Sequence, residues 1–237
     1  MTTEPENPSE VVVSIKNVTA QLSSVPGQFI VTIQTNHGDF EAVFVPVQGR
    51  TACVIFIGDE GAQGVYRELS EALAEECGIS SLRLRPRVAG EFTDGLLDTI
   101  AACSFLKGIG AETAVVVGHS YAGAIAVRAG TISPFIRAVV AIAPQRYGTQ
   151  GVEEMHKPLL LIHGANDDVL PPLASDDVYQ RANEPKEMVI VEDTGHSFEG
   201  QGPRLYALLD EFIRKHLVGV DGPPGSPPPP PPPTSEQ

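Results

Sequence analysis

A serine stands among very small residues that could hold it on a sharp turn. The segment reads Gly118-His119-Ser120-Tyr121-Ala122-Gly123 and directly follows the apolar run 113–117. A serine on a tight strand-to-helix turn can act as a nucleophile, and the residues two before and two after it must be small. Gly118 and Ala122 meet that requirement, although glycine is more usual at the second position. Alone the motif is weak, because a glycine-rich helix start has the same pattern.

An acidic residue follows a second apolar run. Pro158–Ile162 reads as a strand, and the loop after it presents Asp167 beyond Gly164. A carboxylate there can hold an imidazole in one tautomer and stabilise its cation. Asp168 is the alternative, since either residue could cap the next turn or lie on the surface. We prefer Asp167 as the acid.

A histidine follows the last predicted strand. Glu187–Val191 reads as that strand, and Gly195 in the loop after it would let the chain turn sharply before His196. A lone loop histidine is usually just exposed. Here the chain order is serine, acid, histidine, and each residue follows a strand. This order favours nucleophilic catalysis with His196 as the base.

Three arginines also follow predicted strands. Arg85 and Arg87 come after one strand and Arg146 after another, at the edge where open parallel sheets bind ligands. Arg146 is the candidate contact for a carboxylate-bearing substrate. The alternative, which we favour, is that these arginines pair with nearby acids such as Glu91 or Glu153.

The other histidines give no ligand set. We expect His119 to pack away from the serine and His163 to have a structural role. The remaining ones lie in turn, loop and helix contexts: His37, His156 and His216. No spacing matches a metal-binding motif, so the sequence predicts no metal.

Strands and helices alternate along most of the chain. Phe29–Gln34 and Glu41–Val47 flank a turn signal and predict a hairpin. Repeated strand–helix units follow, among them a strand at Ile136–Ile142 and a helix at Asp176–Asn183. They indicate an open, mostly parallel α/β sheet with helices on both faces. Counting from Phe29 we expect about eight strands, and Val11–Val18 is a candidate edge strand before them.

These motifs together resemble the α/β-hydrolase superfamily, over about Phe29 to Leu217. The sequence looks most similar to small members without a cap, such as dienelactone-hydrolase-like and acyl-peptidase-like esterases. Dienelactone hydrolases proper use cysteine as nucleophile, so Ser120 favours the esterase side. The resemblance implies the α/β-hydrolase fold with an eight-stranded sheet.

The resemblance also implies two backbone donors for an oxyanion. One is the N–H of Tyr121, and the other, in the loop after Ala52–Ile57, is the N–H of Asp59. Family members often have His-Gly in that loop, where this chain has Ile57 before its glycine. A carboxylate of Asp59 turned inward would oppose the developing charge.

The family's lid insertion is missing. Only about a dozen residues, 144–155, join two predicted strands at the point where many members insert a cap. We therefore expect an open site and no cap domain. The resemblance implies a serine hydrolase that cleaves small carboxylic esters, lactones or thioesters through an acyl-enzyme on Ser120, without a cofactor; peptidase chemistry is close behind. The alternative is a catalytically weak scaffold that binds a ligand or a protein.

The two ends have a different composition. Residues 1–9 are polar with two prolines, and 219–237 contain the unbroken run Pro227–Pro233. Both ends are predicted to be disordered, flanking one domain over 10–218. The tail could dock on a protein partner, but a solvated tail is the reading we favour.

Charge and cysteine content bound the partners and the compartment. The formal charge is −14 with a pI near 4.7, which disfavours nucleic acid and anionic membranes as partners. No secretory signal and no apolar run of about 20 residues is present. The three cysteines follow no metal or redox spacing. We therefore expect a cytoplasmic protein.

Overall fold

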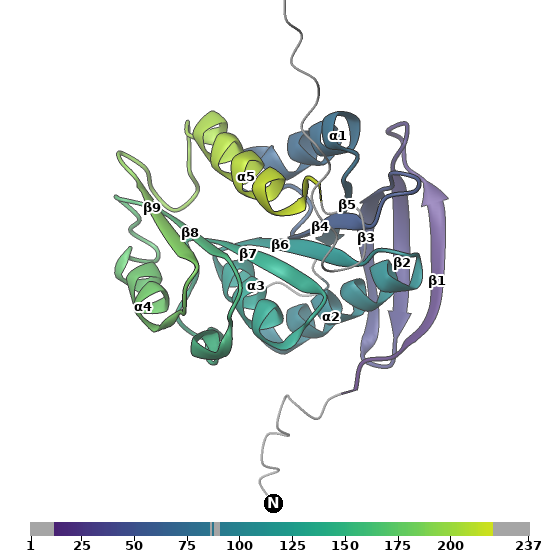
Figure 1. Ribbon diagram of the computed structural model, residues 1–237, viewed down its shortest axis with the longest axis horizontal. Helices are drawn as coiled ribbons and strands as arrows, with labels where there is room; N and C mark the ends of the chain where they lie inside the picture. The colour runs from purple at the N-terminus through teal and green to yellow at the C-terminus, as the bar shows by residue number, and fades with distance from the viewer. Residues whose placement is uncertain (1–11, 86, 88–90, 220–237) are drawn as a thin grey trace, which may run out of the picture.

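The computed structural model describes residues 12–85, 87 and 91–219. The predicted segment 1–9, and all of the predicted tail except its first residue, lie outside these. Figure 1 shows one twisted sheet with helices on both sides. Its nine strands are β1 (Ile15–Leu22), β2 (Phe29–Thr35), β3 (Gly38–Val45), β4 (Ala52–Ile57), β5 (Ser80–Arg85), β6 (Thr113–His119), β7 (Ile136–Ile142), β8 (Leu159–Gly164) and β9 (Lys186–Val191).

The strand order is β1-β2-β3-β5-β4-β6-β7-β8-β9. The pairs from β1 to β5 are antiparallel, and every pair from β5 through β9 is parallel. The eight strands predicted from Phe29 onward are all present. The candidate edge strand is the ninth, but it begins at Ile15, because Ile15 pairs with Thr35 at the end of β2.

Helices cover the two faces of the sheet. They are α1 (Val65–Cys77), α2 (Phe92–Gly108), α3 (Tyr121–Ile132), α4 (Leu173–Arg181) and α5 (Gly202–Leu217), with short 3-10 helices η2 (Ala62–Gly64) and η3 (Val152–Glu154). Helices α1 and α5 lie on one face, and α2, α3 and α4 lie on the other (Figure 1).

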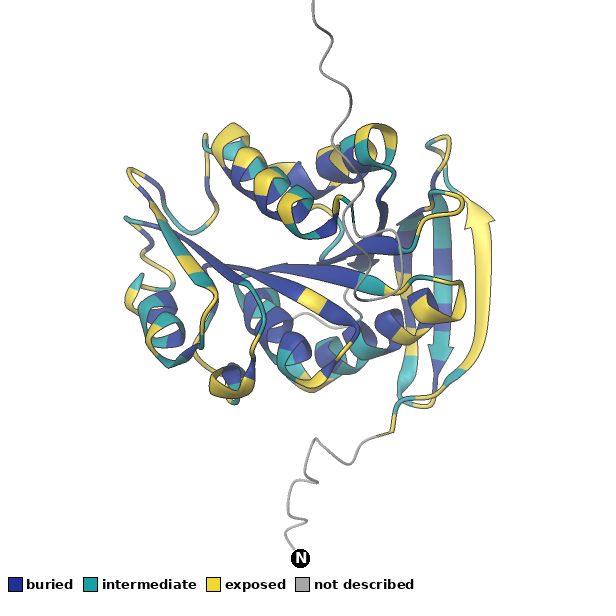
Figure 2. Ribbon diagram, viewed as in Figure 1, coloured by how far each residue is buried: buried dark blue, intermediate teal, exposed yellow. Residues whose placement is uncertain are grey.

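The core forms two apolar layers, one on each side of the sheet. Strands β4 and β8 are buried along their whole length, as Figure 2 shows for the centre of the sheet. Strands buried on both faces read as continuous apolar runs, and this is the pattern of 52–57 and 159–162. These strands give the loops at their carboxyl ends a rigid base.

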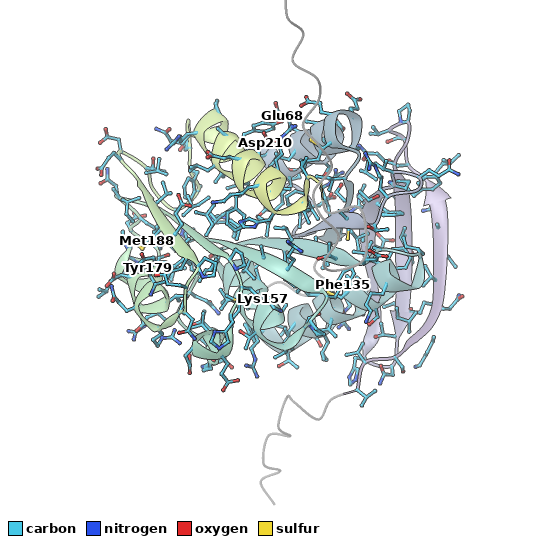
Figure 3. All side chains as sticks on the ribbon, viewed as in Figure 1. Glu68, Phe135, Lys157, Tyr179, Met188 and Asp210 are labelled. Atoms are coloured by element: carbon cyan, nitrogen blue, oxygen red, sulfur yellow. The ribbon has the colours of Figure 1, made fainter. Side chains whose placement is uncertain are left out.

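Two lysine side chains cap the carboxyl ends of helices α3 and α4. Nζ of Lys157 donates to the carbonyl oxygens of Gly130 and Ser133, both at 2.6 Å, near the end of α3. Nζ of Lys186 donates to the carbonyl oxygens of Tyr179 and Ala182 near the end of α4, at 2.8 and 2.9 Å. Lys157 and Tyr179 are labelled below the sheet in Figure 3. Such contacts satisfy carbonyl groups that a helix end leaves unpaired.

The connection from β7 to β8 is short. Its only helical element is η3, of three residues, and the structure describes this connection throughout. The expected absence of a cap at this point is therefore confirmed. Among residues 12–85, 87 and 91–219, no helix combines the length and apolarity needed to cross a membrane.

Candidate active site

Ser120 lies on a strained turn between β6 and α3. Its backbone has φ 59° and ψ −120°, a conformation that non-glycine residues rarely adopt. A Cβ on Gly118 would lie 2.1 Å from the carbonyl oxygen of Ala122, so no side chain fits there. A Cβ on Gly123 would lie 3.2 Å from the carbonyl oxygen of Ile142, which shows how closely α3 approaches β7. The predicted need for small residues is met in the structure.

Three side chains from three loops form a hydrogen-bonded chain. Nε2 of His196 lies 2.9 Å from Oγ of Ser120, and Nδ1 of His196 lies 2.7 Å from Oδ2 of Asp167. The side chain of Asp167 is fully buried, whereas Asp168 is exposed. The structure thus brings Ser120, Asp167 and His196 together, in an arrangement that can move a proton from the serine to the imidazole.

Asp167 is held as an anion by directed donors. Its Oδ1 accepts the N–H groups of Val169 at 2.9 Å and Leu170 at 2.8 Å. Burial acts to raise the pKa of Asp167, but the N–H of Leu170, the His196 side chain and the N–H of Val169 outweigh it. The pKa is therefore below its ordinary value, and the carboxylate is charged at neutral pH.

Backbone hydrogen bonds tie the acid's loop to the histidine's loop. The N–H of Asn166 donates to the carbonyl oxygen of Thr194 at 2.9 Å. A Cβ on Gly164 would lie only 2.3 Å from that same oxygen. The loops are therefore fixed relative to each other, which fixes the approach of Asp167 to His196.

The predicted role of Gly195 in the turn is wrong. On either side of His196, the residues with positive φ are Asp193 at 53° and Phe198 at 54°, and Gly200 follows at 73° before α5. A Cβ on Gly195 would meet only the carbonyl oxygen of Asn166, at an ordinary 3.9 Å. The sharp turn around His196 is made on either side of it by two residues with side chains.

His119 contacts the site, which the sequence did not predict. Its Nε2 donates to the backbone carbonyl of His196 at 2.9 Å, and the two rings lie 4.9 Å apart, tilted by 34°. Burial is the main cause that lowers the pKa of His119 to about 4. His119 is therefore neutral at neutral pH, and it fixes the backbone of His196 through that hydrogen bond. Its position directly before the serine was the one available signal.

The carboxylate of Asp59 is engaged by β5. Oδ1 lies 3.3 Å from Nε of Arg83, and Oδ2 lies 2.8 Å from Nε of Arg85. These contacts compensate its charge, so it does not face the serine as a free anion. Tyr121 is the first residue of α3, where helix N–H groups have no intrahelical acceptor.

The strand-end arginines form ion pairs, as the preferred reading expected, but with other acids than those named. Arg85 also reaches Glu41, its register partner across β3 and β5, at 3.4 Å. Arg87 pairs with Asp98 at 2.9 Å. These acids come from neighbouring strands and helices that the sequence alone does not place.

Arg146 is the most exposed of the three. Its side chain is 65% exposed and pairs with Asp177 of α4 at 2.8 Å. Glu153, the partner expected for it, contacts Arg181 instead, at 3.5 Å. Within the described part of the chain, no cluster of three or more His, Cys, Asp or Glu side chains could hold a metal ion.

Aromatic side chains gather beside the serine. The ring of Tyr121 meets Phe92 edge to face at 6.1 Å, and Phe92 meets Tyr147 at 5.7 Å. Tyr147 is 68% exposed. An apolar wall thus begins at the residue after Ser120 and ends at the surface.

Comparison with known proteins identifies the fold. No protein-family model and no curated protein matches the sequence at a significant level. Solved structures do: dienelactone hydrolase from Anabaena variabilis matches with 19% identity and TM-score 0.69, over 80% of this chain and 98% of that one. Est1E from Butyrivibrio proteoclasticus matches with 16% identity and TM-score 0.67, over 79% and 98%.

A third similar structure is XC6422 from Xanthomonas campestris, described as an α/β serine hydrolase without a lid. It matches with 19% identity and TM-score 0.66, over 87% of this chain and 100% of that one. Together with the topology, these likenesses show that the chain has the α/β-hydrolase fold. The predicted fold class is confirmed.

Proposed function

We propose that this protein is a serine hydrolase that cleaves small carboxylic esters, including lactones or thioesters, through an acyl-enzyme on Ser120. The observation that carries the proposal is the chain of hydrogen bonds at 2.9 and 2.7 Å from Ser120 through His196 to Asp167. The strained turn that presents Ser120 supports it, since strain in such a place is typical of functional sites. The similar structures that are described as esterases agree with it.

The first half-reaction forms the acyl-enzyme. Oγ of Ser120 attacks the carbonyl carbon while its proton moves to Nε2 of His196. The oxygen that becomes negative is held by the N–H groups of Tyr121 and Asp59. When the tetrahedral intermediate collapses, the bond to the leaving oxygen or sulfur breaks, and His196 gives its proton to that atom.

The second half-reaction releases the acid. His196 takes a proton from water, the hydroxide oxygen bonds to the acyl carbon, and Ser120 leaves with the proton returned by His196. Asp167 stays ionised throughout and stabilises the imidazolium in both steps. No cofactor enters this scheme.

Arg146 is the proposed contact for a substrate that carries a carboxylate. Its exposure of 65% leaves the guanidinium accessible, and the 2.8 Å pair with Asp177 holds it in place. Such a substrate would have to share Arg146 with Asp177, so the gain in affinity over a neutral ester should be small.

Turnover of p-nitrophenyl acetate and butyrate tests the proposal. We expect wild type to hydrolyse both and Ser120→Ala to fall to the background rate, because the mutant lacks the nucleophile. Arg137→Ala, a substitution on the exposed position of β7, is the control and should keep full activity. If wild type and Ser120→Ala were equally inert, the binding-scaffold alternative would be the better account.

A further inference from the structure

A second histidine contacts the acid of the triad. His163 lies in β8 with its side chain fully buried, and its Nε2 is 3.1 Å from Oδ2 of Asp167. This is the same oxygen that Nδ1 of His196 approaches at 2.7 Å. The same Nε2 is 2.8 Å from the carbonyl oxygen of Leu170. Nδ1 of His163 is 2.6 Å from Oγ of Ser175 in α4.

The partners of His163 assign its protons. A backbone carbonyl can only accept, so Nε2 carries the hydrogen and donates it to Leu170. Oδ2 of Asp167 lies beside the same N–H group, 3.1 Å from Nε2. Nδ1 can then accept the hydroxyl proton of buried Ser175. The neutral tautomer with its proton on Nε2 satisfies every polar atom of the imidazole with the partners present.

His163 fixes the surroundings of Asp167 in two ways. The carboxylate accepts three hydrogen bonds: the N–H groups of Val169 and Leu170 donate to Oδ1, and His196 donates to Oδ2. His163 holds the carbonyl of Leu170, and so fixes the residue whose N–H donates to Oδ1. The same N–H group of His163 lies 3.1 Å from Oδ2, where its positive end favours the carboxylate.

From this geometry we propose that His163 is a positioning residue of the triad, which fixes the carboxylate of Asp167 through Leu170 and through the contact of its N–H group with Oδ2. The inference deepens the proposed hydrolase function and rests on it. His163 touches no substrate and acts only through Leu170 and Asp167. Its position is set by β8, a fully buried strand next to the edge strand β9, and by the hydrogen bond to Ser175 in α4.

The surroundings of the carboxylate contain few other side chains that could take over this role. Among the described residues, the titratable side chains that contact the Asp167 carboxylate are His163 and His196, and His119 lies against His196. Without His163, the loop at Leu170 loses its hydrogen bond to β8, and the carboxylate should be less well oriented toward His196.

The test compares His163→Leu with His163→Gln, whose side-chain amide can still donate, and with Val178→Ala. Val178 is fully buried in the same helix as Ser175, so its truncation loosens this packing but leaves the donors of Asp167 in place. We expect His163→Leu to lower kcat about ten- to hundredfold with little change in KM, because it removes the hydrogen bond to Leu170 and the polar contact with the Asp167 carboxylate. His163→Gln should recover part of that loss.

Two readouts separate positioning from stability alone. In His163→Leu kcat should fall while KM changes little, and in Val178→Ala kcat should stay near the wild-type value. In proton NMR, His163→Leu should also shift the resonance of the His196 Nδ1 proton, a readout that needs no turnover. An unchanged kcat and an unshifted resonance in folded His163→Leu would overturn the proposal. An inactive wild type with the resonance shift intact would instead count against the hydrolase function alone.

Discussion

At the scale of single residues, the candidate site consists of Ser120, one aspartate and three histidines that contact one another. His196 is the proposed base, His119 holds its backbone carbonyl, and His163 contacts the same carboxylate oxygen as the base does. Burial keeps His119 neutral, while Asp167 is kept charged by three donors. The proposed base thus lies between a neutral ring and a carboxylate that is fixed in place.

His119 gives a pH-dependent stability prediction. Its pKa is about 4 in the folded protein, mainly because of burial, and about 6.5 in an unfolded chain. As the pH falls below about 6.5, the unfolded chain takes up a proton that the folded protein does not accept until about 4. The stabilisation is therefore complete above about 6.5 and is lost toward 4. We expect the free energy of unfolding to fall by about 2 kcal/mol from pH 7 to pH 5 through this group.

Urea unfolding of wild type and His119→Gln at both pH values measures this effect. Glutamine can donate to the carbonyl of His196 but does not titrate, so the variant should lose less stability on acidification than wild type. Equal losses in the two proteins would show that His119 is not the group responsible.

The sequence predicted the three residues that the structure brings together, but not the two histidines that contact them. Ser120, Asp167 and His196 each follow a strand, and their order along the chain is a local signal. The contacts of His119 and His163 depend on how separate loops meet, as with the 2.9 Å bond from His119 to His196. Such contacts have no local pattern, so both residues read only as packing or structural positions.

At the scale of elements, the turn between β6 and α3 depends on one glycine. A Cβ on Gly118 would lie 2.1 Å from the carbonyl oxygen of Ala122, and that oxygen belongs to the backbone of α3. We expect Gly118→Ala to reduce esterase activity at least a hundredfold and to lower stability by about 2 kcal/mol or more, because the turn must open.

Gly108→Ala is the matched control for that prediction. Gly108 is the last residue of α2, and a Cβ there would meet nothing within 4 Å. We expect this variant to be as active as wild type and equally or slightly more stable. Thermal unfolding and p-nitrophenyl acetate turnover of both variants provide the comparison. A fully active Gly118→Ala would contradict the account of the turn.

Element types were easier to predict than element ends. The buried strands have continuous apolar runs, so β4, β6, β7 and β8 were predicted within a residue or two. Helix α4 was expected at Asp176–Asn183 but begins at Leu173, directly after Pro172. Proline is well tolerated at a helix start, and the helix then ends earlier, at Arg181. Pro172 was thus the local signal in the sequence for the start of α4.

At the scale of the whole molecule, the site lies at the carboxyl ends of the parallel strands, where no lid from the β7–β8 connection covers it. Strands β4, β6, β8 and β9 are parallel, so their carboxyl ends bring Asp59, Ser120, Asp167 and His196 to one edge. The connection between β7 and β8 adds only η3 and no lid. The topology therefore assembles the triad, and nothing in that connection encloses a long acyl chain.

The absence of a lid between β7 and β8 predicts a preference for short acyl groups. A long chain gains affinity only where apolar surface is buried, at about 25 cal/mol for each Å². Without a lid, added methylenes stay largely in water and add little binding. We expect kcat/KM for p-nitrophenyl esters to be highest for acetate or butyrate and not to rise toward octanoate or laurate, measured below the aggregation limit of each ester. A steady rise with chain length would point to an acyl tunnel instead.

The overall topology was predicted because its signals are regular. Alternating strands and helices predict a parallel sheet, and the hairpin at 29–45 predicts its antiparallel start. The pairing of Asp59 with Arg83 and Arg85 was not predicted, since it depends on the neighbourhood of β4 and β5. That pairing matters for the proposed function, because a free Asp59 carboxylate turned toward the site would oppose the negative charge that develops on the substrate.

Labelling with a fluorophosphonate probe tests the central claim most directly, because only an activated serine reacts. Wild type should gain the mass of one adduct, and peptide mapping should locate it on Ser120. Ser120→Ala should gain none, and His196→Ala should react far more slowly because its serine lacks a base. A wild-type protein that stays unlabelled, or that is labelled at a residue other than Ser120, would contradict the account.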